Sequence, residues 1–353
     1  MKRSLNHPMN RGVERHKYIC WVNQVIAASR GRALNYLDKF RVHFYLDARH
    51  SHEVCSWVQF ALEKGAQHLE LNCFQGNGSK KRRNCSFPML QPGPLSSIGQ
   101  LKSVSLNQVS IDSEKLDRLL STCKSLETLR VSWSHALTHL EVVSPDPLQL
   151  KSLELSFCSK LETVVITAPT PDLVSLHCHG SERGVTKLHL KCAPRLVDLL
   201  IGGCRDIARL APQPSLSFYL AQLESLSVTL QRKIYPRVPD GIFWRLPEMK
   251  NLKHLTVLVD DKNYYYKDLY DVNFLIRKAP FLEHLTVHAR CCMQFQDARR
   301  RKLKPKHPLQ HLRMAKYVGF RGFRGDEQLI LHLLQTAVSP EKLIIDFQDP
   351  MPL

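Results

Sequence analysis

The chain has 353 residues and a formal net charge of +18, from 50 Lys and Arg against 32 Asp and Glu. Hydrophobic residues make up 43% and glycines number only 15, a globular composition that excludes a disordered or fibrous chain. No stretch approaches the roughly 18 apolar residues that a membrane-spanning helix needs. We therefore expect no membrane partner and a place in the nucleus or the cytoplasm.

The first part of the chain predicts a cap that precedes the repeats. Residues 1–17 are basic and lack any apolar run, so we assign them to a disordered N-terminus. Residues 18–95 form an N-terminal cap and loop, with an amphipathic helix over 18–29, a strand near 37–44 and a second helix over 53–64. Terminal coils of a solenoid need such a cap because their outer faces have no neighbour.

Two runs of basic residues stand out from this ordinary composition. Lys80–Arg83 lies in a segment rich in Gly, Ser and Asn, and Arg299–Lys306 lies between two repeats. Such runs serve as nuclear-import signals or anion-binding patches, and they are as often plain solvated loops. Neither run is interleaved with aromatic residues that could stack on bases, so nucleic acid is not an expected partner.

An L-x-x-L-x-L signature repeats along residues 96–315. Its last two positions alternate, which places both side chains on one face of a short strand that needs a stacked copy to bury them. Between residues 126 and 201 the signature recurs every 11–13 residues, so two copies make one leucine-rich-repeat coil with a strand on each side. The copies begin at Leu101, Leu126, Leu137, Leu150, Leu161, Leu173, Val185, Leu196, Leu223, Leu252, Leu282, Leu309 and, beyond this region, Pro340.

Beyond residue 201 the spacing widens to 27–31 residues, which leaves room for a helix in each coil, and Asp268–Lys278 has the apolar period of one. Residues 316–353 form a C-terminal repeat and cap, in which Gly319–Gly325 is either a turn or an anion-holding loop. The sequence therefore predicts an α/β leucine-rich-repeat solenoid, a right-handed horseshoe with strands on the concave side and helices and strands on the convex side. The middle leucines should form one buried ladder, namely Leu153, Leu188, Leu226, Leu255, Leu285 and Leu312.

The cysteines and histidines do not form a catalytic or metal-binding pattern. Eleven cysteines contain no C-x-x-C pair, and Cys158 and Cys204 occupy the place after a strand where a small residue turns the chain. His177 and His179 share one strand face, but no second pair stands nearby at metal-ligand spacing. Because the chain also lacks a G-x-S-x-G turn, a P-loop and a G-x-G-x-x-G motif, we expect no enzyme, cofactor or metal.

The residues between and just after the apolar pair of each strand should point to the concave side, where solenoids usually bind partners. Hydroxyl residues dominate there and charges are few, which favours a polar protein partner over a phosphate-lined ligand. The alternative is that this side is only solvated strand surface. The expected binding residues are Ser105, Asn107, Arg130, Ser132, Glu154, Ser156, His177, His179, Ser227, Thr229, Thr256, Thr286, His288 and Arg313.

The order of several segments resembles the plant F-box proteins with leucine-rich repeats and an FBD-type C-terminal region, over about residues 18–350. The segments are Trp21–Gln24, Gly31, the strand Leu37–Phe44, the Trp57 helix, the double signatures of 126–201, the GFRG run, Leu329–Ala337 and Glu341–Asp346. The resemblance implies an F-box that docks on the Skp adaptor of a ubiquitin ligase and repeats that present a surface to a substrate. Residues 1–17 contain a single leucine where that F-box would stand, so we do not expect the Skp adaptor as a partner.

Two functions from different classes remain. The first is a non-catalytic protein–protein interaction module, monomeric, that resembles the substrate-binding part of an SCF-type ubiquitin-ligase receptor without a recognisable F-box. The alternative is a basic nuclear scaffold or anion-binding repeat protein, unconnected to ubiquitination, that uses Lys80–Arg83 and Arg299–Lys306.

Overall fold

The structure is a computed structural model whose residues fall into two compact units, Met1–Lys160 with Ala168–Pro171 and Leu161–Thr167 with Asp172–Leu353. Both basic runs, Lys80–Arg83 and Arg299–Lys306, lie outside the described residues, as does Cys204. The described residues are 8–30, 37–74, 84–90, 100–179, 187–202, 214–230, 246–261, 267–291, 308–322 and 324–347.

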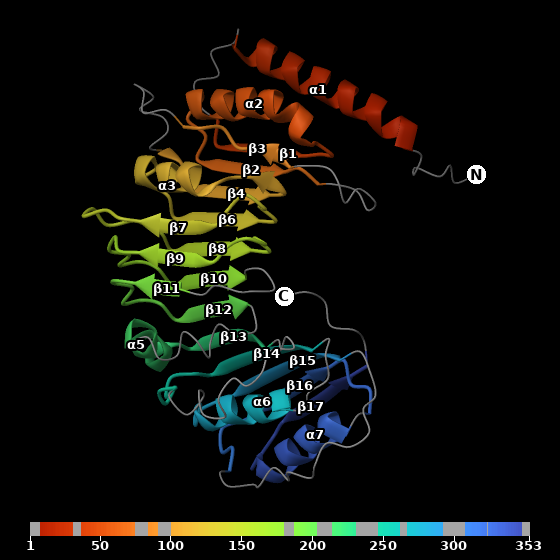
Figure 1. The fold of residues 1–353 in the computed structure, drawn as a ribbon, viewed down its shortest axis with the longest axis vertical. Helices are drawn as coiled ribbons and strands as arrows, with labels where there is room; N and C mark the ends of the chain where they lie inside the picture. The colour runs from red at the N-terminus through yellow and green to blue at the C-terminus, as the bar shows by residue number, and fades with distance from the viewer. Residues whose placement is uncertain are drawn as a thin grey trace. The chain divides into compact units, whose positions relative to one another are not determined.

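The first unit contains five parallel strands of the main sheet (Figure 1). They are β1 (Lys39–His43), β2 (His68–Asn72), β4 (Ser103–Asn107), β6 (Thr128–Ser132) and β8 (Ser152–Ser156), and neighbours in this order pair with one another. The pairing is in register, so the third apolar position of every coil forms one row of residues that are at most 1% exposed. That row consists of Val42, Leu71, Leu106, Val131 and Leu155.

Two helices and a short 3-10 turn cover the beginning of this sheet (Figure 1). The second helix, α2 (Ser51–Glu63), follows η1 (Ala48–His50) and buries the predicted stripe around Trp57. The Trp57 indole Nε1 donates a hydrogen bond of 2.7 Å to Asn23 on α1 (Pro8–Arg30), which ties the two helices together. Because α1 begins at Pro8, residues 8–17 are helical, whereas we had assigned them to a disordered N-terminus.

The other side of the first unit carries shorter elements. The helix α3 (Ser113–Thr122) buries Leu116, Leu119 and Leu120, and Asp112 caps its N-terminus by accepting a hydrogen bond of 3.0 Å from the Lys115 N–H. Two further strands, β3 (Cys85–Ser86) and β5 (Val109–Ser110), pair with each other, and β7 (His139–Val142) packs on α3.

The second unit contains the other seven of the twelve strands in the long parallel sheet. These strands are β10 (Ser175–His179), β12 (Asp198–Gly202), β13 (Ser225–Leu230), β14 (His254–Asp261), β15 (His284–Cys291), β16 (Met314–Val318) and β17 (Lys342–Asp346). Alternate copies of the signature form strands that do not belong to this sheet. Two of them, β9 (Thr163–Ile166) and β11 (Lys187–Leu190), pair with each other instead. The predicted pair of strands per coil between residues 126 and 201 is thus confirmed.

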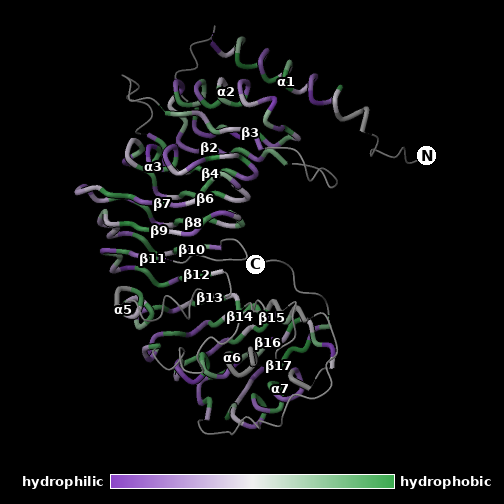
Figure 2. The backbone as a smooth tube through the Cα atoms, viewed as in Figure 1, coloured by the Kyte–Doolittle hydropathy of each residue, from purple (hydrophilic) through white to green (hydrophobic). Residues whose placement is uncertain are grey.

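The predicted α/β solenoid is confirmed, and so is the burial of the six middle leucines. They do not form one ladder, however, because Leu188 lies on β11 outside the main sheet and Leu312 precedes β16. All six middle leucines are at most 2% exposed, and Figure 2 shows hydrophobic and hydrophilic residues alternating along the strands. Helices replace the second strand in the longer coils, as α5 (Pro214–Gln222), α6 (Lys267–Arg277) and α7 (Arg324–Thr336). The helix expected at Asp268–Lys278 is α6, and it buries Val272, Leu275 and Ile276.

The prediction for the coil that begins at Leu309 is wrong in register. In β16 the positions that align with Leu285 and Val287 of β15 are Ala315 and Tyr317, three residues later than the predicted Leu312 and Met314. Tyr317 is 1% exposed, and its hydroxyl donates a hydrogen bond of 2.6 Å to Asp326 of α7. An alanine and a tyrosine fill the two positions, so a search for leucines could not locate them. The expected boundary between residues 315 and 316 also falls inside β16.

Candidate functional site

The side of the main sheet opposite the buried ladder carries polar side chains, and we call it the open face. Alternation along each strand places every second residue there, and the parallel register sets equivalent residues side by side. In the first unit one row of the open face runs through Arg41, Glu70, Ser105, Arg130 and Glu154. The corresponding row of the second unit runs through His177, Leu200, Ser227, Thr256, Thr286, Lys316 and Ile344.

All but one of the predicted binding residues lie on the open face. Ser156 and Thr229 are there but are largely buried, with exposures of 9% and 5%. Arg313 is the exception, because it precedes β16 and pairs with Glu341 at 4.0 Å between Nε and Oε1. The residue between the two apolar positions of β16 is Lys316, which the sequence argument missed. The others are Ser105, Asn107, Arg130, Ser132 and Glu154 in the first unit and His177, His179, Ser227, Thr256, Thr286 and His288 in the second.

Charged side chains on the open face of the first unit are paired across strands. Glu70 lies 3.2 Å from the Lys39 Nζ and 3.1 Å from the Arg41 Nε. The Arg130 Nε lies 3.3 Å from a Glu154 carboxylate oxygen. Exposed pairs of this kind stabilise a fold by only about 0–1 kcal/mol, so a partner can compete for them at little cost. Lys39, Arg41 and Glu70 were not predicted because they belong to the segment assigned to the cap.

Two aromatic residues stack at the ends of neighbouring strands of the first unit. Trp133 follows β6 and Phe157 follows β8, and their rings lie 4.5 Å apart at an angle of 12°. Both residues have positive φ, 60° and 55°, and Gln108 takes the same position after β4 with φ 55°. The Trp133 N–H donates to the Ser156 carbonyl at 2.9 Å, and the Gln108 N–H donates to the Ser132 carbonyl at 2.9 Å. These two left-handed residues thus each add one bond to the ladder before the chain turns.

The Trp133 ring is exposed at a place where the backbone favours glycine. A left-handed conformation costs an L-residue about 1–2 kcal/mol, and a glycine would make the same turn without that cost. Trp133 is nonetheless 42% exposed, and the Asn84 side chain holds its carbonyl at 2.7 Å. Strain of this kind concentrates at functional sites. The sequence signal that we overlooked is the repetition of Ser-Trp and Ser-Phe, Ser132–Trp133 and Ser156–Phe157.

The second unit contains Ser175, His177 and Asp198 in contact, but not in the geometry of a catalytic triad. The His177 Nε2 lies 2.7 Å from the Asp198 Oδ2 and 3.2 Å from the Ser175 Oγ. A triad needs the serine and the carboxylate on different ring nitrogens, whereas here both contact Nε2. Burial raises the pKa of Asp198, but hydrogen bonds from His177, Ser225 and Ser175 outweigh it and lower that pKa overall. The cluster is a polar network that fixes His177 on the open face.

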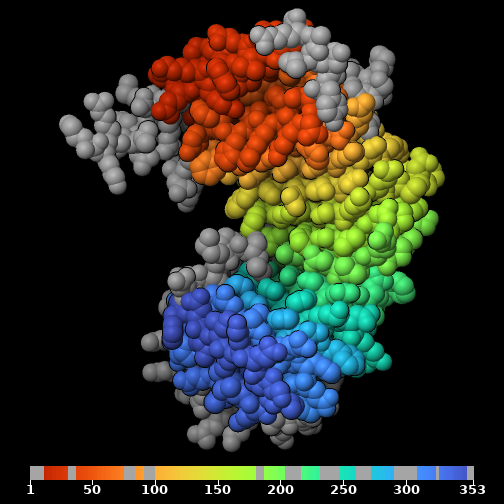
Figure 3. Space-filling model, turned by 180° about the vertical axis from the view of Figure 1, so that it is seen from behind, coloured from red at the N-terminus to blue at the C-terminus, as the bar shows by residue number. Residues whose placement is uncertain are grey.

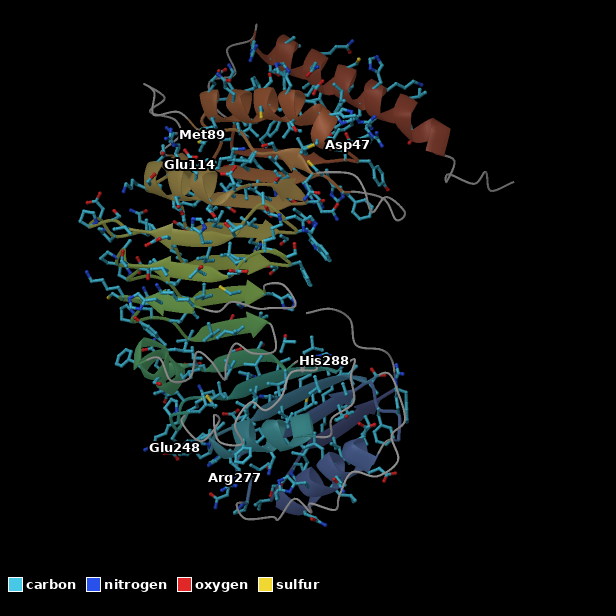
Figure 4. The ribbon with its side chains drawn as sticks, viewed as in Figure 1. Asp47, Met89, Glu114, Glu248, Arg277 and His288 are labelled. Carbon is cyan, nitrogen blue, oxygen red and sulfur yellow. The ribbon has the colours of Figure 1, made fainter. Side chains whose placement is uncertain are left out.

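His179, His254 and His284 of this face pack against neighbouring strands. A Cβ at Gly202 would lie 2.1 Å from the His179 Nδ1, so the imidazole ring rests directly against glycine backbone. The rings of His254 and His284 stack at 4.7 Å and 13°. Figure 4 labels His288 on β15. Among the residues that the structure describes, no three His, Cys, Asp or Glu side chains gather as metal ligands would.

The fold and the open face together define a leucine-rich-repeat interaction module. Residues 83–351 match the family model described as "At1g61320/AtMIF1, LRR domain", so the chain belongs to this family of leucine-rich-repeat domains. It is also 27% identical over 141 residues to an F-box/LRR-repeat protein of Arabidopsis thaliana, At5g02930. That similarity covers 35% of this chain and 30% of the Arabidopsis protein. Within the described ranges, no helix combines the length and the hydropathy of a membrane span.

Proposed function

We propose that the chain is a non-catalytic protein-binding module of the F-box/LRR type, related to the substrate-binding part of SCF-type ubiquitin-ligase receptors. We further propose that its C-terminal region is of the FBD type. The observation that carries the proposal is the stacked pair Trp133–Phe157, held at the ends of β6 and β8, the two strands that carry the Arg130–Glu154 ion pair.

The physics of protein interfaces favours this place for the partner. Most binding energy at interfaces comes from a few residues, with Trp, Tyr and Arg the most frequent among them. The Trp133 ring is already fixed by its stack and by the backbone ladder, so binding would cost little side-chain entropy. Arg130, two residues before Ser132 on the same strand, offers a planar charged group that can exchange Glu154 for a carboxylate of the partner.

The chemistry of the first unit's open face limits the kind of partner. Positive and negative side chains alternate along its middle row, from Arg41 and Glu70 to Arg130 and Glu154. Clustered Arg or Lys would be needed for a phosphate-rich ligand. We therefore propose a protein segment that carries an acidic group for Arg130 and an aromatic or aliphatic side chain for the Trp133 ring.

A displayed peptide library selected on the whole chain tests this proposal. Peptides that bind through the proposed site should lose at least tenfold in affinity when Arg130→Glu reverses the charge, because a direct carboxylate contact is worth about 1.5–3 kcal/mol. The melting temperature of the variant should stay unchanged, since the exposed pair with Glu154 contributes little.

The matched control is Arg118→Glu, the same charge reversal on α3, which packs on β7 rather than on the open face. Equal loss of binding in both variants, or loss only with Arg118→Glu, would place the partner elsewhere. The alternative function, a basic nuclear scaffold, depends on residues outside the described ranges and stays a prediction.

A further inference from the structure

The strand β17 ends the main sheet of the second unit, and among the described residues no strand pairs with its other edge. On its inner side the Lys342 N–H donates to the Arg313 carbonyl, and the Asp346 carbonyl accepts from the Gly319 N–H. Backbone groups of successive residues in a strand point to opposite sides. Residues 342, 344 and 346 therefore bond to β16, and Leu343 and Ile345 direct their N–H and C=O groups to the open edge.

The side chains of this last strand are less covered than those of any internal strand of the unit. Ile345 pairs with Tyr317, and Tyr317 pairs with Val287, so the three residues occupy equivalent positions on neighbouring strands. Ile345 is nevertheless 38% exposed, whereas Val287 is 1% exposed. Ile344 is also 38% exposed and Phe347 is 73% exposed. Figure 3 shows the C-terminal part of the described chain, in dark blue, at the surface of the second unit. An apolar, unprotected edge strand is a template for pairing with another strand.

The sequence of β17, Lys-Leu-Ile-Ile-Asp, is complementary to itself when two copies run antiparallel. With Ile344 opposite Ile344, each Lys342 stands opposite the Asp346 of the other copy, and each Leu343 stands opposite Ile345. Opposite charges and apolar residues in directly facing positions are the stabilising cross-strand pairs. A parallel, in-register arrangement would instead place each lysine beside a lysine.

The backbone hydrogen-bonding groups of β17 are compatible with the same antiparallel register. In an antiparallel pair, facing residues alternate between those that exchange both hydrogen bonds and those that exchange none. The residues with outward backbone groups, Leu343 and Ile345, face each other in this register, so they can exchange both bonds. Lys342 faces Asp346 in the closer, non-hydrogen-bonded position, where side chains interact best.

We propose that the chain forms a homodimer by antiparallel pairing of β17 with β17 of a second copy, about a two-fold axis at Ile344. A two-fold interface requires a patch that is complementary to itself, and the charge order of this strand meets that requirement. The dimer differs from the monomer expected from the sequence. It extends the sheet of the second unit across two copies.

Analytical ultracentrifugation of the full chain tests the dimer. The measurement is made at about 0.15 M salt, where charge repulsion between exposed groups is screened within about 8 Å. The wild-type chain should show a monomer–dimer equilibrium. Lys342→Asp alone and Asp346→Lys alone each turn two attractive pairs into two repulsive ones, so each should weaken dimerisation about tenfold or more.

An equimolar mixture of the two variants provides the decisive measurement. In a mixed dimer both positions again face opposite charges, so dimerisation should return to near the wild-type level. The matched control is Lys187→Asp on β11, which makes the same charge change outside the main sheet and should have no effect. A wild-type chain that stays monomeric over the whole concentration range would overturn the proposal, and so would a mixture that fails to recover.

A second pair of variants guards against misfolding of the charge-reversed chains. Ile344→Lys sets two ammonium groups opposite each other at the axis and should abolish the dimer, whereas Ile344→Thr retains a β-branched residue and should retain most of it. Equal behaviour of the two would overturn the antiparallel register. Loss of the dimer in Ile344→Lys together with intact peptide binding at Arg130 would separate this proposal from the proposed function.

Discussion

Trp133 shows how a single residue can hold a strained backbone conformation for the sake of its side chain. Its φ of 60° is of the kind that glycine adopts freely, and the stack of its ring on Phe157 is worth about 0.5–1.5 kcal/mol. The strain of about 1–2 kcal/mol is at least as large. The stack by itself therefore does not offset the strain of a tryptophan at this position, which agrees with a binding role.

The comparison of backbone strain with ring stacking predicts an unusual order of stabilities among variants at position 133. Trp133→Ala keeps the strained φ and loses the stack, so it should destabilise the chain by about 1 kcal/mol. Trp133→Gly loses the same stack but relieves the strain, and it should unfold at nearly the wild-type urea concentration. Gln108→Gly is the control, because Gln108 has the same φ without a stacked ring, and it should be neutral or slightly stabilising. A glycine variant less stable than the alanine variant would contradict the strain argument.

At the scale of elements, Asp47 joins α1 to the turn that starts α2. Figure 4 labels this residue beside the N-terminal helices. Its carboxylate accepts hydrogen bonds from the Arg49 Nη2 at 2.8 Å and Nε at 3.0 Å, and the Arg15 Nη1 of α1 lies 3.7 Å away. The hydrogen bonds from the Arg49 side chain are the main reason that the pKa of Asp47 falls to about 2.

The lowered pKa predicts how Asp47 contributes to stability as pH changes. A carboxyl group whose pKa is lower in the folded state stabilises the fold fully above its unfolded pKa and loses that contribution as pH falls through the folded pKa. Asp47→Asn should therefore reduce the free energy of unfolding at pH 7 by on the order of 1 kcal/mol, after allowance for screening of the exposed Arg49. Urea titrations should show the difference from wild type shrinking between about pH 4 and pH 2. A difference that is the same at pH 7 and pH 2 would contradict this role.

At the scale of the whole molecule, the charge of +18 is partly concentrated in the two basic runs. If these runs are import signals, a fluorescent fusion of the full chain should concentrate in the nucleus. Replacing Lys80–Arg83 and Arg299–Arg301 with alanine should then spread the fusion into the cytoplasm. The control removes scattered exposed cations, such as Lys124, Lys160 and Arg195, and should leave the distribution unchanged. An unchanged distribution in the first variant would identify both runs as solvated loops.

The spacing of leucines along one strand was enough to predict the repeat, the burial of the middle leucines and the alternation of two strands per coil. A strand with two apolar residues on one face can bury them only against a copy of itself, so the period implies the stack. Leu153 and Leu226 could therefore be predicted as buried before any contact was known.

Only the tertiary structure decided the features that depend on neighbours across coils. The register of β16 follows from pairing with β15 rather than from its own residues, since Ala315 and Tyr317 do not resemble the leucines that they replace. The stack of Trp133 on Phe157 requires the rise between adjacent coils and a left-handed backbone, neither of which spacing specifies. The open edge of β17 is visible only once the strand order is known, because an edge is defined by the absence of a neighbour among the described strands.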